Sequence, residues 1–169
     1  MTTTPKETLQ HKCPDLAEMS EFLYDEADLL DQTNLKDWID LFSEDGTYWM
    51  PVVVGQIDPL NHISIFYDDK AMMQIRRHNL KHANAPSKEI DVRSSHIIGN
   101  VRIISFDEEN GNCQVKSNFQ AVVYYGTQTM FAGTYTHDLV KSNDKYLIRQ
   151  KRVDLINCDA SHSSIINYI

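Results

Sequence analysis

A change of hydrophobic period after Asp91 constrains the fold more than any other feature of the chain. From there to Cys158, apolar and polar residues alternate, a pattern typical of β-strands with one buried face. The alternation predicts four strands, each about twice the usual length of five or six residues. They cover residues 95–106, 114–125, 129–141 and 146–158. Turn signals such as Asn110-Gly111 separate them, so the sequence predicts an antiparallel meander that must twist and coil.

The first half of the chain carries helical spacing instead. Apolar residues recur every three or four positions in three stretches. These stretches cover residues 16–30, 35–42 and about 70–83. Asp15, with Glu18 three positions later, is a capping signal for the first helix, and Asn34 is one for the second. Asp68 or Asp69 is expected to cap the third.

Two short strands are expected between the second and the third helix. Residues 47–54 are rich in aromatic and β-branched side chains, and Pro51 restricts this strand to an edge or places it at a strand end. Residues 63–67 alternate and predict the other strand. Residues 43–46 carry turn chemistry, so the second helix is expected to end there.

These elements together predict an α+β fold. The concave face of a long coiled sheet needs a filler, and the three N-terminal helices are the available candidates. We therefore expect a cone of curved antiparallel sheet wrapped round three N-terminal helices. The expected organisation is a flexible tail over residues 1–14 and a single domain over residues 15–169, since 169 residues with 41% hydrophobic side chains can form one core.

Composition argues against several partners. The formal net charge of -8 disfavours binding to nucleic acid and to anionic membranes. No apolar stretch is long enough to span a bilayer, and the first ten residues carry no secretion signal. The three cysteines, Cys13, Cys113 and Cys158, form neither a disulfide pattern nor a zinc pattern. A cytoplasmic protein with free thiols is expected.

The sequence also lacks most cofactor motifs. No Cys is followed two residues later by His, as a Rieske cluster requires, and no glycine-rich phosphate loop is present. His78 and His82 have a spacing that can hold a metal, but Arg76, Arg77 and Lys81 beside them disfavour a cation. No metal site is expected in this chain.

Asp31 and His96 form the most suggestive candidate site. His96 begins a long strand, and Asp31 at the end of the first helix could reach it inside the cone, with Tyr48 and Tyr125 lining the same cavity. An Asp–His pair in an apolar cup can act as a general acid–base. Equally, the carboxylate of Asp31 can hydrogen-bond a buried His96 and so fix the first helix to the sheet without any catalytic role. The residues alone leave both interpretations open.

The chain resembles the β subunits of aromatic-ring-hydroxylating dioxygenases, and most closely the benzoate, toluate and anthranilate type. The resemblance covers nearly the whole chain after Asp15. Its motifs are Phe22-Leu23-Tyr24-x-Glu26-Ala27-x-Leu29-Leu30-Asp31, Trp38-x-x-Leu41-Phe42-x-x-Asp45-x-x-Tyr48-Trp49-Met50-Pro51, Asp58-Pro59 with Ile63-Ser64-Ile65-Phe66-Tyr67-Asp68-Asp69, Arg93-Ser94-Ser95-His96-Ile97-Ile98-Gly99-Asn100-Val101, Lys151-Arg152-Val153-x-Leu155 and Asn167-Tyr168-Ile169.

This resemblance implies a cystatin-like cone of the nuclear-transport-factor-2 type and a non-catalytic structural subunit. It implies a trimer of β subunits bound to a trimer of catalytic α subunits, α3β3. The α subunit would carry the Rieske [2Fe-2S] cluster and the mononuclear Fe(II), so no cofactor and no catalytic residue is expected in this chain. The expected reaction is dihydroxylation of the ring of an aromatic acid, in the catabolism of aromatic compounds.

An alternative remains within the wider superfamily, which includes scytalone dehydratase and ketosteroid isomerase. In scytalone-dehydratase-like enzymes, residues at the positions of Asp31 and His96 are catalytic, and this chain matches both. The chain lacks the dehydratases' second histidine, because residues 120–125 contain none. Under this alternative the chain is a stand-alone, cofactor-independent dehydratase or isomerase, with Asp31, His96 and Tyr48 as catalytic residues.

Overall fold

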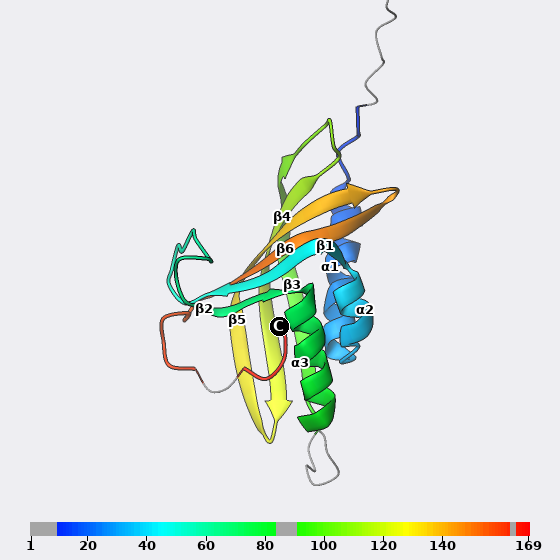
Figure 1. The fold of residues 1–169 in the computed structure, drawn as a ribbon. Helices are drawn as coiled ribbons and strands as arrows, with labels where there is room; N and C mark the ends of the chain where they lie inside the picture. The colour runs from blue at the N-terminus through cyan, green and yellow to red at the C-terminus, as the bar shows by residue number, and fades with distance from the viewer. Residues whose placement is uncertain (1–9, 84–90, 163–164) are drawn as a thin grey trace, which may run out of the picture.

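A long, curved sheet with helices packed on one face makes up the computed structural model, which describes residues 10–83, 91–162 and 165–169 (Figure 1). The helices are α1 (Leu16–Asp31), α2 (Leu35–Asp40) and α3 (Lys70–Ala83). The strands are β1 (Phe42–Pro51), β2 (Ser64–Asp69), β3 (Arg93–Phe106), β4 (Cys113–Tyr125), β5 (Thr127–Ser142) and β6 (Lys145–Leu155). This mixed α+β architecture with a curved sheet confirms the predicted fold class.

The sheet order is β2-β1-β6-β5-β4-β3. The four long strands β3 to β6 form the predicted antiparallel meander. One pairing was not predicted from the sequence: β1 runs parallel to β6. The sheet is therefore antiparallel except at this junction, where the N-terminal β1–β2 pair joins the meander.

The start of β1 departs from the prediction of a turn over residues 43–46. Phe42 pairs with Ile148 and Thr47 pairs with Gln150. Between these two pairs β1 advances by five residues, whereas β6 advances by only two. The extra residues form a bulge, so the chain continues as a strand where a turn was predicted. The sequence predicted that Pro51 lies either in an edge strand or at a strand end, and the structure places it at the end of β1.

Side-chain capping starts each helix as predicted. The carboxylate of Asp15 accepts a hydrogen bond from the backbone N–H of Glu18 at 2.7 Å, and Asp69 accepts one from Met72 at 2.8 Å. Asn34 does the same for α2, from the N–H of Asp37 at 3.4 Å. These bonds satisfy backbone donors that the first helical turn leaves without partners.

The core lies between the concave face of the sheet and the helices. Alternate residues of β4 and β5 are buried there, and α1 contributes its apolar stripe. Gly133 lets β5 pass close to β6, because a Cβ at this position would collide with the carbonyl oxygen of Asp154. The buried apolar residues of α1 are Met19, Leu23, Ala27 and Leu30.

Part of the expected tail at residues 1–14 lies outside the described residues, which begin at position 10. The backbone N–H of His11 donates to the carbonyl oxygen of Glu108 at 2.9 Å, and Pro14 is buried. Within residues 10–83, 91–162 and 165–169, no helix combines the length and apolar character needed to cross a membrane.

Candidate functional site

Asp31 and His96 are in direct contact, as the sequence suggested. Nδ1 of His96 lies 2.6 Å from Oδ1 of Asp31, and the backbone N–H of His96 donates to Oδ2 at 2.9 Å. The hydroxyl of Ser94 donates to Oδ1 at 3.0 Å. Asp31 therefore accepts three hydrogen bonds from the first residues of β3 and joins them to the C-terminal end of α1.

The ring of His96 points into the protein, with only 1% of its side chain exposed. Burial lowers the pKa of His96, although the hydrogen bond from Nδ1 to Asp31 acts in the opposite direction. Because an ionised carboxylate only accepts, Nδ1 carries the hydrogen of the neutral ring. Nε2 is then the unprotonated nitrogen, and it has no hydrogen-bond partner among the described residues.

Tyr48 takes no part in this pair. Its hydroxyl donates to the carbonyl oxygen of Ile169 at 3.0 Å and accepts from the N–H of Ile169 at 3.4 Å. Burial raises the pKa of Tyr48 far above its ordinary value. Tyr125 is only half-buried and lines a surface hollow beside residues 165–167. The structure thus brings Asp31 and His96 together, whereas the hydroxyl of Tyr48 is hydrogen-bonded to Ile169.

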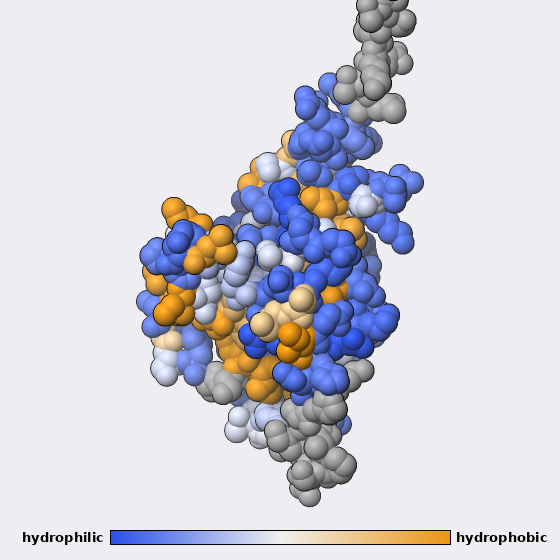
Figure 2. Space-filling view, in the orientation of Figure 1, coloured by the Kyte–Doolittle hydropathy of each residue, from blue (hydrophilic) through white to orange (hydrophobic). Residues whose placement is uncertain are grey.

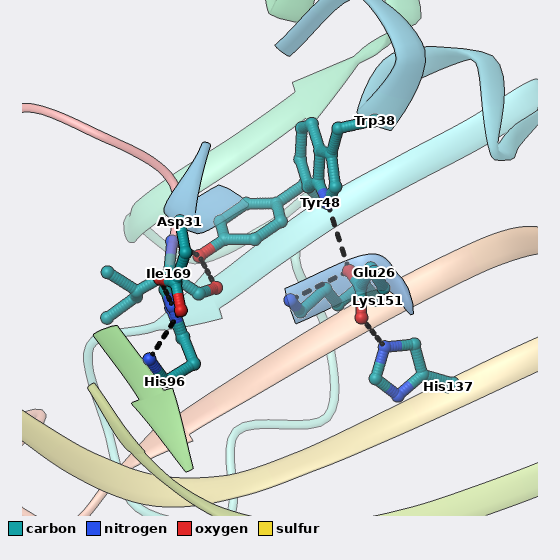
Figure 3. A network of polar contacts seen from close by, with 8 residues as sticks. All are labelled: Glu26, Asp31, Trp38, Tyr48, His96, His137, Lys151 and Ile169. Atoms are coloured by element: carbon teal, nitrogen blue, oxygen red, sulfur yellow. Dashed lines mark hydrogen bonds and ion pairs between the residues drawn. The ribbon is translucent and has the colours of Figure 1, made fainter. Parts of the chain in front are cut away.

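A second polar centre, which the sequence analysis missed, surrounds Glu26 on α1 (Figure 3). Its Oε1 accepts from Nε1 of Trp38 at 3.0 Å, and its Oε2 lies 2.9 Å from Nε2 of His137. Nζ of Lys151 lies 2.8 Å from Oε1, in the contact of an ion pair rather than of a well-directed hydrogen bond. The side chains of Glu26, His137 and Lys151 are at most 2% exposed, so this is an ionic cluster in the core.

Burial by itself would raise the pKa of Glu26. The positive charge of Lys151, and the charge and hydrogen bond of His137, outweigh burial and hold that pKa well below its ordinary value. Burial lowers the pKa of Lys151, and its pairing with Glu26 offsets only part of this effect. The ammonium also lies 4.1 Å from the centroid of the Tyr135 ring, which adds a cation–π contact.

One sequence signal could have revealed this cluster. Glu26 stands within the apolar stripe of α1, between Leu23 and Ala27, where a carboxylate requires a buried partner. His137 and Lys151 lie at inward-facing positions of β5 and β6 and are 0% exposed. The strand pattern alone predicts their burial but not their meeting with Glu26.

The predicted absence of a metal site concerned His78 and His82. His78 lies on the exposed side of α3, and the side chain of His82 lies outside what the structure describes. Among the described residues, no group of three or more His, Cys, Asp or Glu side chains could hold a metal ion. Cys13 is exposed, Cys113 and Cys158 are buried, and all three are free thiols.

The arrangement favours anchoring over turnover. Each carboxylate accepts its hydrogen bonds from protein groups on neighbouring elements, and the hollows that flank residues 165–167 are lined by neither Asp31 nor His96. Nε2 of His96 is one of three buried histidine nitrogens without a partner among the described residues, and the side chain of His96 is closed off from solvent.

Comparisons of this chain with a family model, with curated proteins and with solved structures all point to ring-hydroxylating β subunits. The family model described as "Ring hydroxylating beta subunit" matches residues 25–161. The β subunit of toluate 1,2-dioxygenase from Pseudomonas putida is 30% identical over 143 residues, which are 81% of this chain and 87% of that protein. The crystal structure of the β subunit of benzoate 1,2-dioxygenase from Burkholderia mallei superposes with a TM-score of 0.74 at 28% identity, covering 94% of this chain and 100% of that one.

A candidate scytalone dehydratase from Novosphingobium aromaticivorans superposes with a TM-score of 0.62 at 18% identity, covering 83% of this chain and 85% of that one. At this identity the likeness concerns the fold alone. The same cone therefore occurs in both kinds of protein that the sequence left open, and fold does not separate them.

Proposed function

The chain belongs to the ring-hydroxylating β-subunit family, and from this premise we propose that it is the structural subunit of a dioxygenase acting on an aromatic acid. It is thus part of an oxidoreductase without carrying the chemistry. One observation supports this role most directly: the carboxylates of Asp31, which is 25% exposed, and of the buried Glu26 are both engaged by groups of the chain itself.

The partner we propose is a catalytic α subunit that holds the Rieske [2Fe-2S] cluster and the mononuclear Fe(II). The described residues of this chain do not fit either centre, because no three metal-ligating side chains gather. A Rieske cluster needs two cysteines and two histidines, but the buried Cys113 begins β4 whereas the buried Cys158 lies in the turn after β6. Residues 15–169 would act as one cytoplasmic domain in this complex.

Uncovered apolar surface supports assembly as α3β3 with a β trimer. The loop between β1 and β2 exposes five large apolar side chains, of which Ile57 is 90% exposed (Figure 2). The five are Val53, Val54, Ile57, Leu60 and Ile63. A second apolar group, Ile97, Met130 and Ile156, is exposed on the outer side of the sheet. Apolar clusters of this kind mark protein interfaces, and a subunit that contacts both its copies and a partner needs more than one.

The test is co-expression of this chain with the α subunit encoded beside it, recognised by its Cys-x-His and Cys-x-x-His motifs. We expect an iron-containing complex that forms a cis-dihydrodiol from an aromatic acid, whereas the chain by itself is colourless and iron-free. Sedimentation of the chain alone should give a trimer. A stable monomer at micromolar concentration would contradict the assembly.

The alternative function is a cofactor-independent dehydratase or isomerase, and the unpaired Nε2 of His96 is the observation that favours it. This activity would use Asp31 to orient the ring of His96 and would reside in the isolated chain. Turnover of a hydroxylated cyclic compound by the isolated wild type, lost in a normally folded His96→Ala variant, would replace the subunit proposal.

A further inference from the structure

The segment Ile165–Ile169 enters the cone: Asn167, Tyr168 and Ile169 are buried, and Ile165 and Ile166 are half-buried at its mouth. Figure 1 shows it, in red, between α3 and the sheet. Tyr168 is 2% exposed and Ile169 is 0% exposed. This segment fills space that the helices and the sheet do not fill themselves.

Tyr168 is held as a phenol would be held in a binding site. Its ring stacks on Trp38 with centroids 4.6 Å apart, and Tyr48 packs edge-on at 4.8 Å. Its hydroxyl donates to Oδ2 of Asp68 at 2.8 Å. Asp68 is itself buried and paired with Arg76, so the acceptor is a fixed carboxylate. An aromatic platform and a charged acceptor are thus aligned on one hydroxylated ring.

The space continues on both sides of this segment. One hollow of about 260 Å³ lies towards α2 and α3, and another of about 350 Å³ lies towards β4 and β5. Ile165, Ile166 and Asn167 belong to the walls of both hollows. The side chain of Asn167 is buried there with neither polar atom hydrogen-bonded among the described residues. The segment therefore separates two neighbouring hollows.

We propose that Ile165–Ile169 occupies a binding site for a phenolic ring, with Tyr168 as its internal ligand. The ring of a free phenol would stack on Trp38, and its hydroxyl would donate to Asp68. The buried side chain of Asn167, which borders both hollows without a hydrogen-bond partner among the described residues, is available to a second polar substituent. This inference does not depend on the assembly proposed above.

The proposed site should prefer a ring that carries a hydroxyl over one that does not. A ring without a hydroxyl would leave the buried carboxylate of Asp68 short of one donor, and such a loss costs about tenfold or more in affinity. Because Tyr168 is tethered, its effective concentration at the site is on the order of millimolar or higher. The full chain should therefore bind a free phenol at least about tenfold more weakly than a variant whose site is vacated.

The experiment vacates the site with Tyr168→Ala and probes it with 4-methylphenol, which is the side chain of tyrosine. We expect 4-methylphenol to raise the melting temperature of this variant and to bind it about tenfold or more tightly than toluene does, measured by calorimetry. Tyr24→Ala, which removes a tyrosine that is 43% exposed, is the matched control and should show neither effect. Adding Asp68→Leu to Tyr168→Ala should abolish the preference for the hydroxyl while toluene still binds.

Equal binding of both compounds by folded Tyr168→Ala, or binding of neither, would overturn the proposal. If that variant does not fold, the wild type still tests it by hydrogen exchange. Excess 4-methylphenol should displace the segment and speed exchange of the Tyr168 and Ile169 amides more than toluene at the same concentration. Exchange that does not respond to 4-methylphenol, or responds equally to both compounds, would likewise refute it.

Discussion

The ion pair between Glu26 and Lys151 allows a sharp test of what a buried charge does in this core. Lys151→Met keeps an unbranched side chain as far as Cε and removes the ammonium 2.8 Å from Oε1 of Glu26. The carboxylate then stays buried with only Trp38 and His137 as partners. Breaking a buried ion pair from one side costs about 3–5 kcal/mol. At roughly 2–4 °C per kcal/mol for a chain of this size, the melting temperature should fall by about 6–20 °C.

A double variant distinguishes the loss of the attraction between Lys151 and Glu26 from the cost of leaving the Glu26 carboxylate buried without its partner. Glu26→Gln combined with Lys151→Met removes both charges but keeps an amide oxygen that can accept from Trp38. If the cost of Lys151→Met comes mainly from the uncompensated carboxylate, the double variant should be about 1–3 kcal/mol more stable than the single variant. Urea unfolding followed by circular dichroism measures both, since the midpoint moves in proportion to stability when the slope is unchanged.

Lys36→Met is the matched control. Lys36 also pairs with carboxylates, at 3.3 Å from Asp37 and 3.5 Å from Asp40, but its side chain is 63% exposed. Solvent screens such pairs, so its urea midpoint should stay within error of wild type. An unchanged midpoint for Lys151→Met, or a double variant no more stable than the single one, would refute the reasoning.

The same cluster sets the acid stability of the fold. The folded pKa of Glu26 lies below its ordinary value of 4.5, because Lys151 and His137 favour the carboxylate. Its contribution to stability is therefore fully present above pH 4.5 and is lost as the pH falls towards the folded pKa. Glu26→Gln should flatten the decline of unfolding free energy below that pH. An equally steep acid decline in this variant would assign the titration to other groups.

Three further predictions concern separate parts of the chain. His96→Ala should lower the free energy of unfolding by about 1–3 kcal/mol, because Asp31 loses one of three donors, while the isolated chain shows no lyase activity before or after; a normally stable variant would contradict the anchoring role. Ile57→Asp should weaken assembly, measured by sedimentation, without changing the melting temperature of the isolated chain, and an unchanged assembly would exclude this loop from the interface. Asp15→Ala should cost about 1 kcal/mol in chemical unfolding through the lost helix cap, and no loss would show that the tail compensates.

Local patterns predicted most of the fold correctly, for physical reasons. The alternation in β4 places Val115, Phe119 and Ala121 on the buried face, and only one register puts all three inside. The caps of α1 and α3 depend on side chains within three residues of the N–H groups they satisfy. Such features are encoded over a few positions, so a single sequence reveals them.

Features that depend on distant partners escaped prediction. The parallel contact of β1 with β6 joins residues about a hundred positions apart, such as Thr47 and Gln150, and no local period encodes it. Asp31 and His96 were predicted to meet because the end of the first helix and the start of a long strand were both expected to face the inside of the cone. Tyr48 was assigned to the same cavity, but the structure gives its hydroxyl to Ile169 instead.

The position of α1 explains why a structural subunit keeps two costly polar centres in its core. An apolar helix stripe on an apolar sheet can slide, because dispersion contacts have little direction. Asp31 fixes the C-terminal end of α1 to β3, while Glu26, five positions earlier, fixes the middle of the helix to β5, β6 and α2. Two directional attachments to opposite parts of the sheet allow a single placement of the helix. The exposed apolar loop after β1 then projects from a rigid body, and a rigid surface loses less entropy when a partner docks on it.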